Sequence, residues 1–338
     1  MKKRTLLTIA QYVIFLGLGI LIIYRMSSSM SDKDKADMME SIRQTRLWLL
    51  APVLVAGFLS HWFRALRWKL LLKPLDIHPS TTNTTLSVLI GYLVNLLLPR
   101  MGEVAKCTVL ARYEHVPADK MVGTILAERA FDVACLVLVT TAAFVLQADV
   151  IGDYASSIFG KLAAKRIFFI GGLTAFAFLI LFLIFLVRRH KQSKIVQFII
   201  GMKDGVTSIL KMKDRGRFLL FTILIWTLYW SQVLLGFWAI PATEHLMLLA
   251  GLVVLIFGSI GMIVTPGGLG AYPALIAEIL FFYGIDDADG KAFGWVSWAA
   301  QTGIVLVLGI GALIILPLYN RNKHHQHHHH AETPVDTE

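Results

Sequence analysis

The chain has 338 residues, 56% of them hydrophobic and only 16% charged, with a mean hydropathy of +0.67. Because soluble domains are closer to one-quarter charged, this composition excludes an ordinary soluble globular protein. The formal net charge of +10 does not indicate nucleic-acid binding, because the basic residues lie in the polar segments between apolar blocks. Such residues set membrane topology and contact anionic lipid.

The apolar residues form long blocks, several of which reach the roughly 20 residues that a membrane-spanning helix needs. The first block follows a basic N-terminus and is too long for a cleaved signal peptide, so we expect it to be retained as a span. The sequence therefore predicts an all-α polytopic membrane protein. In chain order, the apolar blocks are 6–24, 47–63, 82–98, 104–112, 121–147, 167–187, 218–241, 246–265, 268–283 and 292–319.

The charges between the blocks predict how they cross the membrane. Residues 188–217 hold nine Lys or Arg residues, and the positive-inside rule places them, with both termini, in the cytoplasm. This placement requires residues 82–116 to enter and leave on the cytoplasmic side, and residues 246–283 to return to the outside. We expect six full spans plus two re-entrant hairpins, or eight spans if residues 246–283 cross the membrane twice.

The predicted order of elements is the same in the two halves of the chain, with the second half inverted. Inverted repeats are typical of transporters, whose sites lie where broken helices meet near the middle of the membrane. The sequence predicts one integral-membrane domain over residues 1–320, with repeats at about 1–147 and 160–320. A disordered, His-rich cytoplasmic tail is expected over residues 321–338.

The stretch NLLLPRMGEVAK interrupts an apolar region with a helix breaker and three charges. Non-helical backbone at membrane depth is tolerated only inside the protein or beside a wet cavity, so Pro99 and Gly102 predict a buried hairpin tip. Arg100, Glu103 and Lys106 are candidate substrate-binding residues, because intramembrane charges are usually functional. The alternative is that Glu103 and Lys106 form a structural pair, or that the tip reaches the membrane interface.

The stretch AERAFD places Glu128, Arg129 and Asp132 on one flank of a single helix. Two carboxylates around an arginine could hold its guanidinium toward a cavity, where the planar fork suits a phosphate. A purely structural ion cluster is the alternative, and the two interpretations are compatible.

The stretch TPGGLGAYP contains Pro266, Gly267, Gly268 and Gly270. Glycine there would let backbone amides face a ligand, and a helix starting near Leu269 would direct its N-terminal N–H groups toward an anion. The alternative is close helix packing through small residues, which needs no ligand.

The stretch HWFRALRWKLLLKP follows the second apolar block. Arg64, Arg67 and Lys69, together with Trp62 and Trp68, are typical of an anchor at the cytoplasmic interface. A role in gathering lipid headgroups is the alternative. The alternation of apolar residues and lysines over residues 191–217 predicts a basic amphipathic helix on the inner leaflet.

Four of these stretches together resemble the lysylphosphatidylglycerol synthase transmembrane-region family, over roughly residues 10–318. They are RALRWKLLL (64–72), LPRMGEVAK (98–106), AERAFD (127–132) and TPGGLGA (265–271). The resemblance implies the lipid-translocating portion of multiple peptide resistance factors, without their soluble aminoacyl-transferase domain. The family often has Glu soon after the glycine motif, where this chain reads Ala271-Tyr272-Pro273, and Glu278 is the next acid.

We therefore expect a lipid translocator in the inner membrane of a bacterium, acting on a phospholipid or a polyprenyl-phosphate lipid. Arg100, Lys106 and Arg129 would contact phosphate, and the glycine stretch would line the opposite side. The alternatives are a membrane-embedded lipid-modifying transferase with Glu103 or Asp132 as general base, and a non-catalytic partner in envelope assembly. No nucleotide-binding loop or catalytic triad occurs, so we expect no cofactor and no metal. Whether the chain forms a homo-oligomer stays open.

Overall fold

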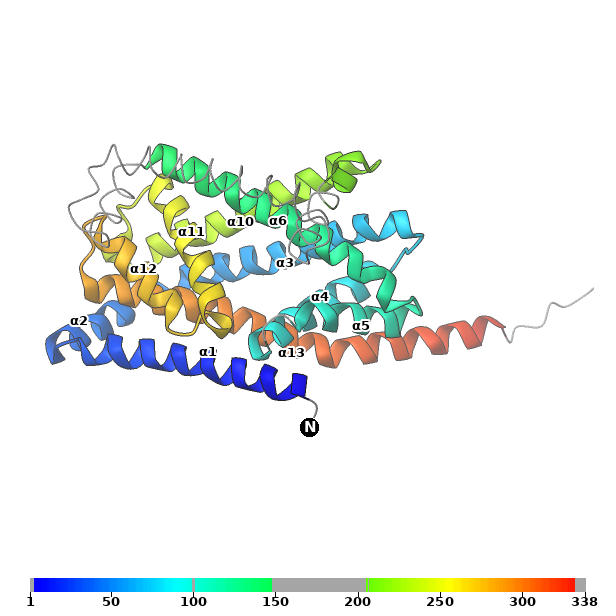
Figure 1. The fold of residues 1–338 in the computed structure, drawn as a ribbon, viewed down its shortest axis with the longest axis horizontal. Helices are drawn as coiled ribbons and strands as arrows, with labels where there is room; N and C mark the ends of the chain where they lie inside the picture. The colour runs from blue at the N-terminus through cyan, green and yellow to red at the C-terminus, as the bar shows by residue number, and fades with distance from the viewer. Residues whose placement is uncertain (1–2, 99–100, 148–204, 206, 332–338) are drawn as a thin grey trace, which may run out of the picture.

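The computed structural model describes residues 3–98, 101–147, 205 and 207–331, and every element in these ranges is a helix (Figure 1). Several predicted features lie outside the described residues: the span 167–187, most of the amphipathic helix 191–217, Pro99 of the predicted hairpin tip, and Arg100. The helices are α1 (Lys3–Ser28), α2 (Asp32–Arg43), α3 (Leu50–Leu72), α4 (Thr81–Leu97), α5 (Gly102–Glu114), α6 (Ala118–Leu146), α10 (Arg215–Ala239), α11 (Leu248–Val264), α12 (Ala271–Phe281) and α13 (Asp287–Ala331), with short 3-10 turns at 47–49, 73–75, 241–243 and 266–268.

Four described helical segments are long and apolar enough to cross a membrane: Leu47–Leu75, Lys120–Leu146, Arg215–Ala239 and Asp287–Arg321. They run roughly along the long axis of the molecule (Figure 1). Large apolar side chains such as Leu138, Ile223 and Val307 are exposed on their outer faces. Lipid-facing side chains in a membrane span have this exposure, and the prediction of an all-helical membrane protein is confirmed.

Two helical hairpins enter the bundle from opposite ends. The α4–α5 hairpin opens toward the end of the molecule where α13 finishes, and the α11–α12 hairpin opens toward the end where α2 lies (Figure 1). The four helices contain 17, 13, 17 and 11 residues. At about 1.5 Å per residue they are roughly 26, 20, 26 and 17 Å long, shorter than the ~30 Å hydrocarbon core. Residues 246–283 contain two short apolar helices, α11 and α12.

The tip of the first hairpin is closed by a side-chain hydrogen bond. Asn95 Oδ1 accepts from the backbone N–H of Gly102, at 2.8 Å, and so caps the start of α5. A Cβ on Gly91 would lie 2.9 Å from the Gly102 carbonyl oxygen, so the two helices touch backbone to backbone here. Small residues permit this approach in membranes, where packing replaces the hydrophobic effect as the force between helices.

The tip of the second hairpin depends on glycine. Gly267, Gly268 and Gly270 have φ values of +60°, +72° and +75°, which L-residues with a Cβ rarely adopt. Trp298 donates from Nε1 to the Gly267 carbonyl at 2.8 Å and holds the turn against α13. A Cβ on Gly267 would lie 2.6 Å from Leu96 Cδ1, so the tips of the two hairpins meet.

The open end of the first hairpin is tied together by polar groups. Glu114, at the end of α5, accepts from the Ser80 N–H at 2.9 Å and from Asn83 Nδ2 at 2.7 Å. Asn83 and Asn320 exchange amide hydrogen bonds of 3.0 and 2.9 Å, which join α4 to α13. Buried amides paired in this way fix the register of neighbouring helices.

The C-terminal end of α13 differs in extent from the sequence prediction. The helical backbone is described as far as Ala331, beyond the last apolar block, which ends at 319. The single-domain assignment over residues 1–320 and the disorder of residues 321–338 stay predictions.

Candidate functional site

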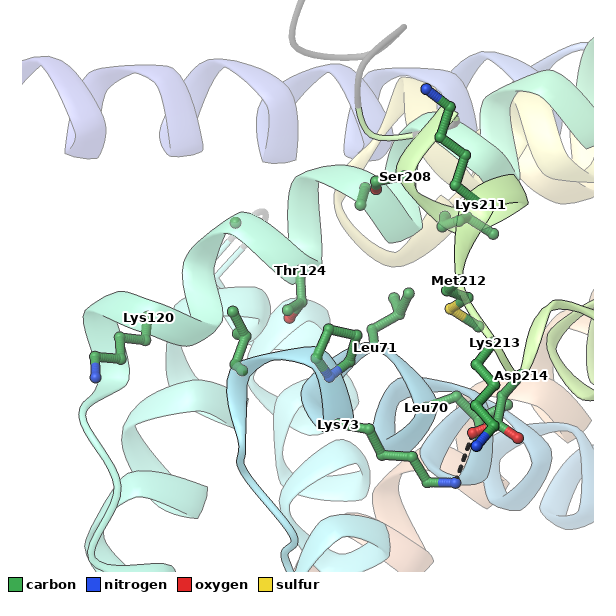
Figure 2. A pocket seen from close by; sticks show the side chains of 15 residues that line it. Leu70, Leu71, Lys73, Lys120, Thr124, Ser208, Lys211, Met212, Lys213 and Asp214 are labelled. Carbon is green, nitrogen blue, oxygen red and sulfur yellow. Dashed lines mark hydrogen bonds and ion pairs between the residues drawn. The ribbon is translucent and has the colours of Figure 1, made fainter.

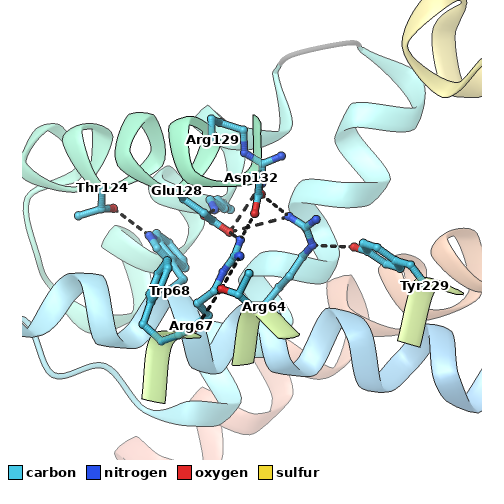
Figure 3. A network of polar contacts seen from close by, with 11 residues as sticks. Arg64, Arg67, Trp68, Thr124, Glu128, Arg129, Asp132 and Tyr229 are labelled. Atoms are coloured by element: carbon cyan, nitrogen blue, oxygen red, sulfur yellow. Dashed lines mark hydrogen bonds and ion pairs between the residues drawn. The ribbon is translucent and has the colours of Figure 1, made fainter. Parts of the chain in front are cut away.

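Six charged side chains from three helices are joined by ion pairs inside the bundle. Figure 3 shows five of them, Arg64, Arg67, Glu128, Arg129 and Asp132. Helix α3 supplies Arg64 and Arg67, helix α5 supplies Lys106, and helix α6 supplies Glu128, Arg129 and Asp132. We call these six residues the charge network. Arg64 and Arg67 are three positions apart on α3, and Asp132 follows Arg129 by three positions and Glu128 by four on α6, which places the residues on one side of each helix.

Glu128 lies at the centre of the charge network and is 1% exposed. Its Oε1 accepts from Arg67 Nη2 at 3.1 Å, and its Oε2 accepts from Lys106 Nζ at 2.8 Å. Arg129 and Arg64 approach the same carboxylate at 3.6 and 4.0 Å. Four cations therefore surround one carboxylate, a geometry that offsets the cost of burying it.

Asp132 lies one helical turn from Glu128 and contacts three of the same cations. Arg67 Nη2 is 2.7 Å from Oδ1, and Arg64 Nη1 is 3.1 Å from Oδ2. Arg129 Nη2 is 3.6 Å from Oδ2. Arg67 thus bridges both carboxylates, and its side chain is completely buried. A completely buried guanidinium held by two carboxylates has the geometry of a structural tie between α3 and α6.

Neutral residues hold the cations in place around this centre. From α10, Tyr229 accepts from Arg64 Nε at 2.7 Å, and Thr222 accepts from Arg67 Nη1 at 3.3 Å. Lys106 Nζ lies 4.5 Å from the ring centroid of Trp68, within cation–π range. Helix α10 therefore orients the arginines of α3 without adding charge of its own.

The charge network is not neutral. Four cations face two carboxylates, so the six side chains carry two excess positive charges. Arg129 is the cation best placed to meet an anion: its side chain is 41% exposed, and its Nε has no hydrogen-bond partner in the described structure. An excess of buried cations at membrane depth is unfavourable unless an anion or water compensates it.

A small pocket of about 30 Å³ lies beside this excess charge. It has room for about two water molecules, far below the several hundred cubic ångströms of a ligand cavity. The conformation described here is therefore closed to a lipid headgroup. The lining residues are Arg64, Val88, Gly91, Tyr92, Asn95, Gly102, Glu103, Lys106, Glu128 and Arg129.

A larger pocket of about 800 Å³ opens at the end of the molecule where α3 meets α6 (Figure 2). Its floor is apolar, and its rim carries Lys73, Lys120, Lys211 and Lys213, so we call it the lysine pocket. Lys73 bonds Asp214 at 2.8 Å, whereas the other three lysines have no ion pair in the described structure.

A single polar contact separates the lysine pocket from the charge network. Thr124 lines the pocket and accepts from Trp68 Nε1 at 2.9 Å, and the Lys106 ammonium lies 4.5 Å from the centroid of the Trp68 ring. The two sites are therefore neighbours through one indole ring.

The structure brings together most of the residues that the sequence singled out. Gly102, Glu103, Lys106, Glu128 and Arg129 line the small pocket, and Asp132 belongs to the charge network. Glu103 forms no ion pair among the described residues; the structural Glu103–Lys106 pair considered above is replaced by the bond from Lys106 to Glu128. The role of these residues in substrate binding stays a prediction.

The glycine stretch does not lie in the small pocket. Gly267 contacts Leu96 at the meeting of the hairpin tips. A Cβ on Gly270 would lie 2.7 Å from the Gly19 carbonyl oxygen of α1, and Pro266 and Gly268 belong to the same turn. Helix α12 starts at Ala271, two residues later than expected. In this conformation the stretch provides close helix packing.

The interpretation of Arg64 and Arg67 as interfacial anchors is wrong. Helix α3 continues to Leu72, so both arginines lie inside the bundle, where Arg67 is 0% exposed. The sequence analysis ended the apolar block at residue 63 because charge interrupts it there. The spacing of the two arginines, three apart with apolar residues between them, continues the helical period and could have shown that they share a buried face.

The described residues contain no group of three or more His, Cys, Asp or Glu that could hold a metal. Glu128 and Asp132 are engaged by arginine and lysine instead.

The described helices, the two hairpins and the buried charge network define an α-helical membrane protein with an ionic centre inside its bundle. Residues 9–327 match the family model of the lysylphosphatidylglycerol synthase TM region, so the chain belongs to that family, as its motifs predicted. No curated protein and no solved structure matches the chain.

Proposed function

We propose that this protein moves a phosphate-bearing lipid between the leaflets of a bacterial inner membrane. The observation that carries the proposal is the excess positive charge of the charge network, which ends in the half-exposed guanidinium of Arg129. A phosphate would neutralise this excess, and guanidinium binds phosphate in a bidentate manner. The membership in a family of lipid-related membrane proteins agrees with a lipid substrate.

An inverted repeat is the second part of the proposal, and the helix registers support it. If α3, α4, α5 and α6 correspond to α10, α11, α12 and α13, the later helix of each pair begins 165, 167, 169 and 169 residues after the earlier one. The pairs of first residues are Leu50 and Arg215, Thr81 and Leu248, Gly102 and Ala271, and Ala118 and Asp287. The nearly constant offset and the opposite entry of the hairpins are those of transporter repeats (Figure 1).

The lysine pocket is the proposed entrance for the headgroup. Its volume of about 800 Å³ lies in the range of ligand sites, and Lys120, Lys211 and Lys213 have no carboxylate partner in the described structure. Basic pockets between spans on the cytoplasmic side bind anionic headgroups. Trp68 links this pocket to the charge network, because it donates to Thr124 and its ring lies against the Lys106 ammonium.

The positive-inside rule supports the proposed orientation. Lys73, Lys211 and Lys213 line the lysine pocket where α3 ends and α6 begins, at the end of the molecule toward which the α4–α5 hairpin opens (Figure 1). The lysine end is therefore the proposed cytoplasmic side, with both chain termini on that side.

The test is a lipid-redistribution assay with purified protein in liposomes. Wild-type protein should speed the movement of a fluorescent phosphatidylglycerol between leaflets, and Arg129→Gln should reduce that rate at least tenfold. Arg43→Gln is a matched control, because Arg43 is exposed at the end of α2 and lines neither the small pocket nor the lysine pocket. Equal rates with wild-type protein and with empty liposomes would refute translocation. A new lipid mass by mass spectrometry, dependent on Glu103, would favour the transferase instead.

A further inference from the structure

A second small pocket lies between α3, α10, α12 and α13. It has a volume of about 20 Å³, and its polar lining residues are Gln232, Tyr272, Ser297 and Gln301. We infer that this neutral pocket is a second polar binding site, the inverted-repeat counterpart of the charge network, and that it takes a hydroxyl group of a lipid headgroup, which is about the size of one water molecule. The inference rests on the inverted repeat of the proposed function.

The registers assign each neutral residue to a charged one. Counted from the start of each helix, the polar residues of the second half occupy the positions that charged residues occupy in the first half. The corresponding pairs are Arg67 and Gln232, Glu103 and Tyr272, Glu128 and Ser297, and Asp132 and Gln301. Helix ends define a register to within one or two residues, and contacts between the helices are an independent check of it.

Contacts between the helices provide that check. In the first half, Arg67 donates to Thr222 of α10 at 3.3 Å. The register predicts that Gln232 contacts the α3 residue equivalent to Thr222, which is Gly57. A Cβ on Gly57 would indeed lie 3.3 Å from Gln232 Oε1. The correspondence therefore holds for side-chain contacts as well as for helix ends.

A second pair of contacts agrees with the same register. Phe131 of α6 and Phe218 of α10 pack edge to face, with ring centroids 5.1 Å apart. The equivalent residues are Ala300 of α13 and Val53 of α3, and both line the neutral pocket. The neutral pocket therefore lies at the place in the second half that the charge network and its flanking rings occupy in the first, and small side chains stand there where aromatic rings fill the first half.

Arg64 and Tyr229 mark the boundary between the halves. Each is the fifteenth residue of its helix, so the hydrogen bond between them joins equivalent positions, 165 residues apart. A contact between equivalent residues lies on or near the pseudo-twofold axis, as in an isologous dimer interface. Gln232 lies one turn beyond Tyr229 on α10. The charge network and the neutral pocket therefore lie on opposite sides of this bond.

The chemistry of the neutral pocket differs from that of its counterpart. No charged residue lines it, so it offers no attraction for a phosphate. Gln301 donates to the Tyr272 hydroxyl at 3.1 Å, whereas Gln232 bonds only its own helix, at 3.3 Å, and Ser297 has no hydrogen bond in the described structure. These groups can donate to and accept from hydroxyls, and polar groups left without partners at membrane depth are costly unless a ligand or water satisfies them.

The test compares two lipids that differ only in hydroxyl groups. Short-chain phosphatidylglycerol and phosphatidylpropanol carry the same phosphodiester charge and the same three-carbon headgroup, and only the first has headgroup hydroxyls. Binding to the purified full-length chain in detergent is followed by tryptophan fluorescence. Wild-type protein should prefer phosphatidylglycerol by about three- to tenfold, the value of one or two net hydrogen bonds.

Variants of the pocket residues test whether the preference for phosphatidylglycerol arises in the neutral pocket. Ser297→Ala and Gln301→Leu should each bring the preference close to one, whereas Ser259→Ala should keep it, because Ser259 bonds the Leu255 carbonyl outside the pocket. Ser297→Ala removes one oxygen atom and keeps the inference testable if Gln301→Leu fails to fold. No preference in wild-type protein, or an unchanged preference in Ser297→Ala, would overturn the inference. Preference without lipid movement in liposomes would overturn translocation and leave the second site standing.

Discussion

Arg64 and Tyr229 form a hydrogen bond of 2.7 Å between the middle of α3 and the middle of α10. The guanidinium carbon of Arg64 also lies 5.5 Å from the Tyr229 ring centroid and 5.9 Å from that of Tyr92. The same arginine bonds Asp132 at 3.1 Å. One side chain therefore connects the charge network to the second half of the chain.

Tyr229→Phe should weaken this connection without changing the shape of the ring. The substitution removes the acceptor of Arg64 Nε and keeps the cation–π contact, so we expect a loss of about 1–3 kcal/mol in the free energy of unfolding. Unfolding in detergent, followed by tryptophan fluorescence, measures the change. Tyr229→Leu should cost more, because it removes the ring as well. Equal stability of Tyr229→Phe and wild-type protein would show that the hydrogen bond contributes nothing.

The sign of the network charge predicts unequal effects of removing a carboxylate and a cation. Glu128→Gln leaves four cations facing Asp132 alone, whereas Arg67→Gln leaves three cations facing two carboxylates. Breaking a buried pair costs about 3–5 kcal/mol when it leaves an uncompensated charge. Glu128→Gln should therefore destabilise the protein by about that amount, and by more than Arg67→Gln does. Thermal unfolding in detergent provides the comparison, and the reverse order would contradict the excess positive charge.

A phosphate-bearing lipid should partly rescue Glu128→Gln. If the phosphate binds the excess cations, short-chain phosphatidylglycerol should raise the unfolding temperature of Glu128→Gln more than that of wild-type protein. Short-chain phosphatidylcholine is the comparison lipid, because its ammonium group opposes the network charge. The same shift with both lipids would indicate a detergent-like effect.

Local periodicity was sufficient to predict part of the site. Glu128 and Asp132 are one turn apart on α6, and Lys106 follows a helix break, so their approach to one another depended on short-range geometry. Arg67 was assigned to the interface because hydropathy ended its span too early. Tyr229 could not have been found from spacing, since it belongs to α10 and contacts Arg64 only in the folded bundle.

The glycine stretch shows a second limit of sequence reasoning. Positive φ at Gly267 and Gly270 is required for the turn, and the same residues also permit the contacts with Leu96 and α1. A glycine-rich turn has the same composition whether its backbone faces a ligand or another helix. Only the positions of α1 and α4 distinguish the two, and those positions are tertiary.

Asp214 is expected to control the charge of the lysine pocket. The hydrogen bond from Lys73 holds the pKa of the Asp214 carboxyl below its usual value. The ion pair therefore persists at neutral pH and is lost only as the pH falls below about 3.8. Asp214→Asn frees Lys73 at neutral pH and should strengthen the binding of anionic lipid several-fold, with a steeper dependence on salt. Titration with phosphatidylglycerol at two salt concentrations measures both effects, and weaker binding by Asp214→Asn would contradict the proposed entrance.

The proposed orientation can be tested by cysteine labelling. Cys107 is buried and Cys135 is partly buried, so both should be replaced by alanine before new cysteines are introduced. Lys211→Cys should be shielded from a membrane-impermeant maleimide in intact cells, whereas Asp286→Cys should react. Both should react after the membrane is opened. Labelling of Lys211→Cys in intact cells would refute the cytoplasmic assignment of the lysine pocket.

The contact between the two hairpin tips predicts that alanine destabilises the protein more at Gly267 than at another glycine with a similar backbone conformation. Gly267 and Gly284 have φ values of +60° and +78°, so alanine is strained at either position by about 1–2 kcal/mol. A Cβ on Gly284 would meet nothing within 4 Å, whereas one on Gly267 would lie 2.6 Å from Leu96 Cδ1. Gly267→Ala should therefore lower the unfolding temperature in detergent more than Gly284→Ala. Gly267→Ala combined with Leu96→Ala should recover the packing part of that loss and leave the strain. Equal effects of the two single substitutions would show that the hairpin tips do not press on each other at this point.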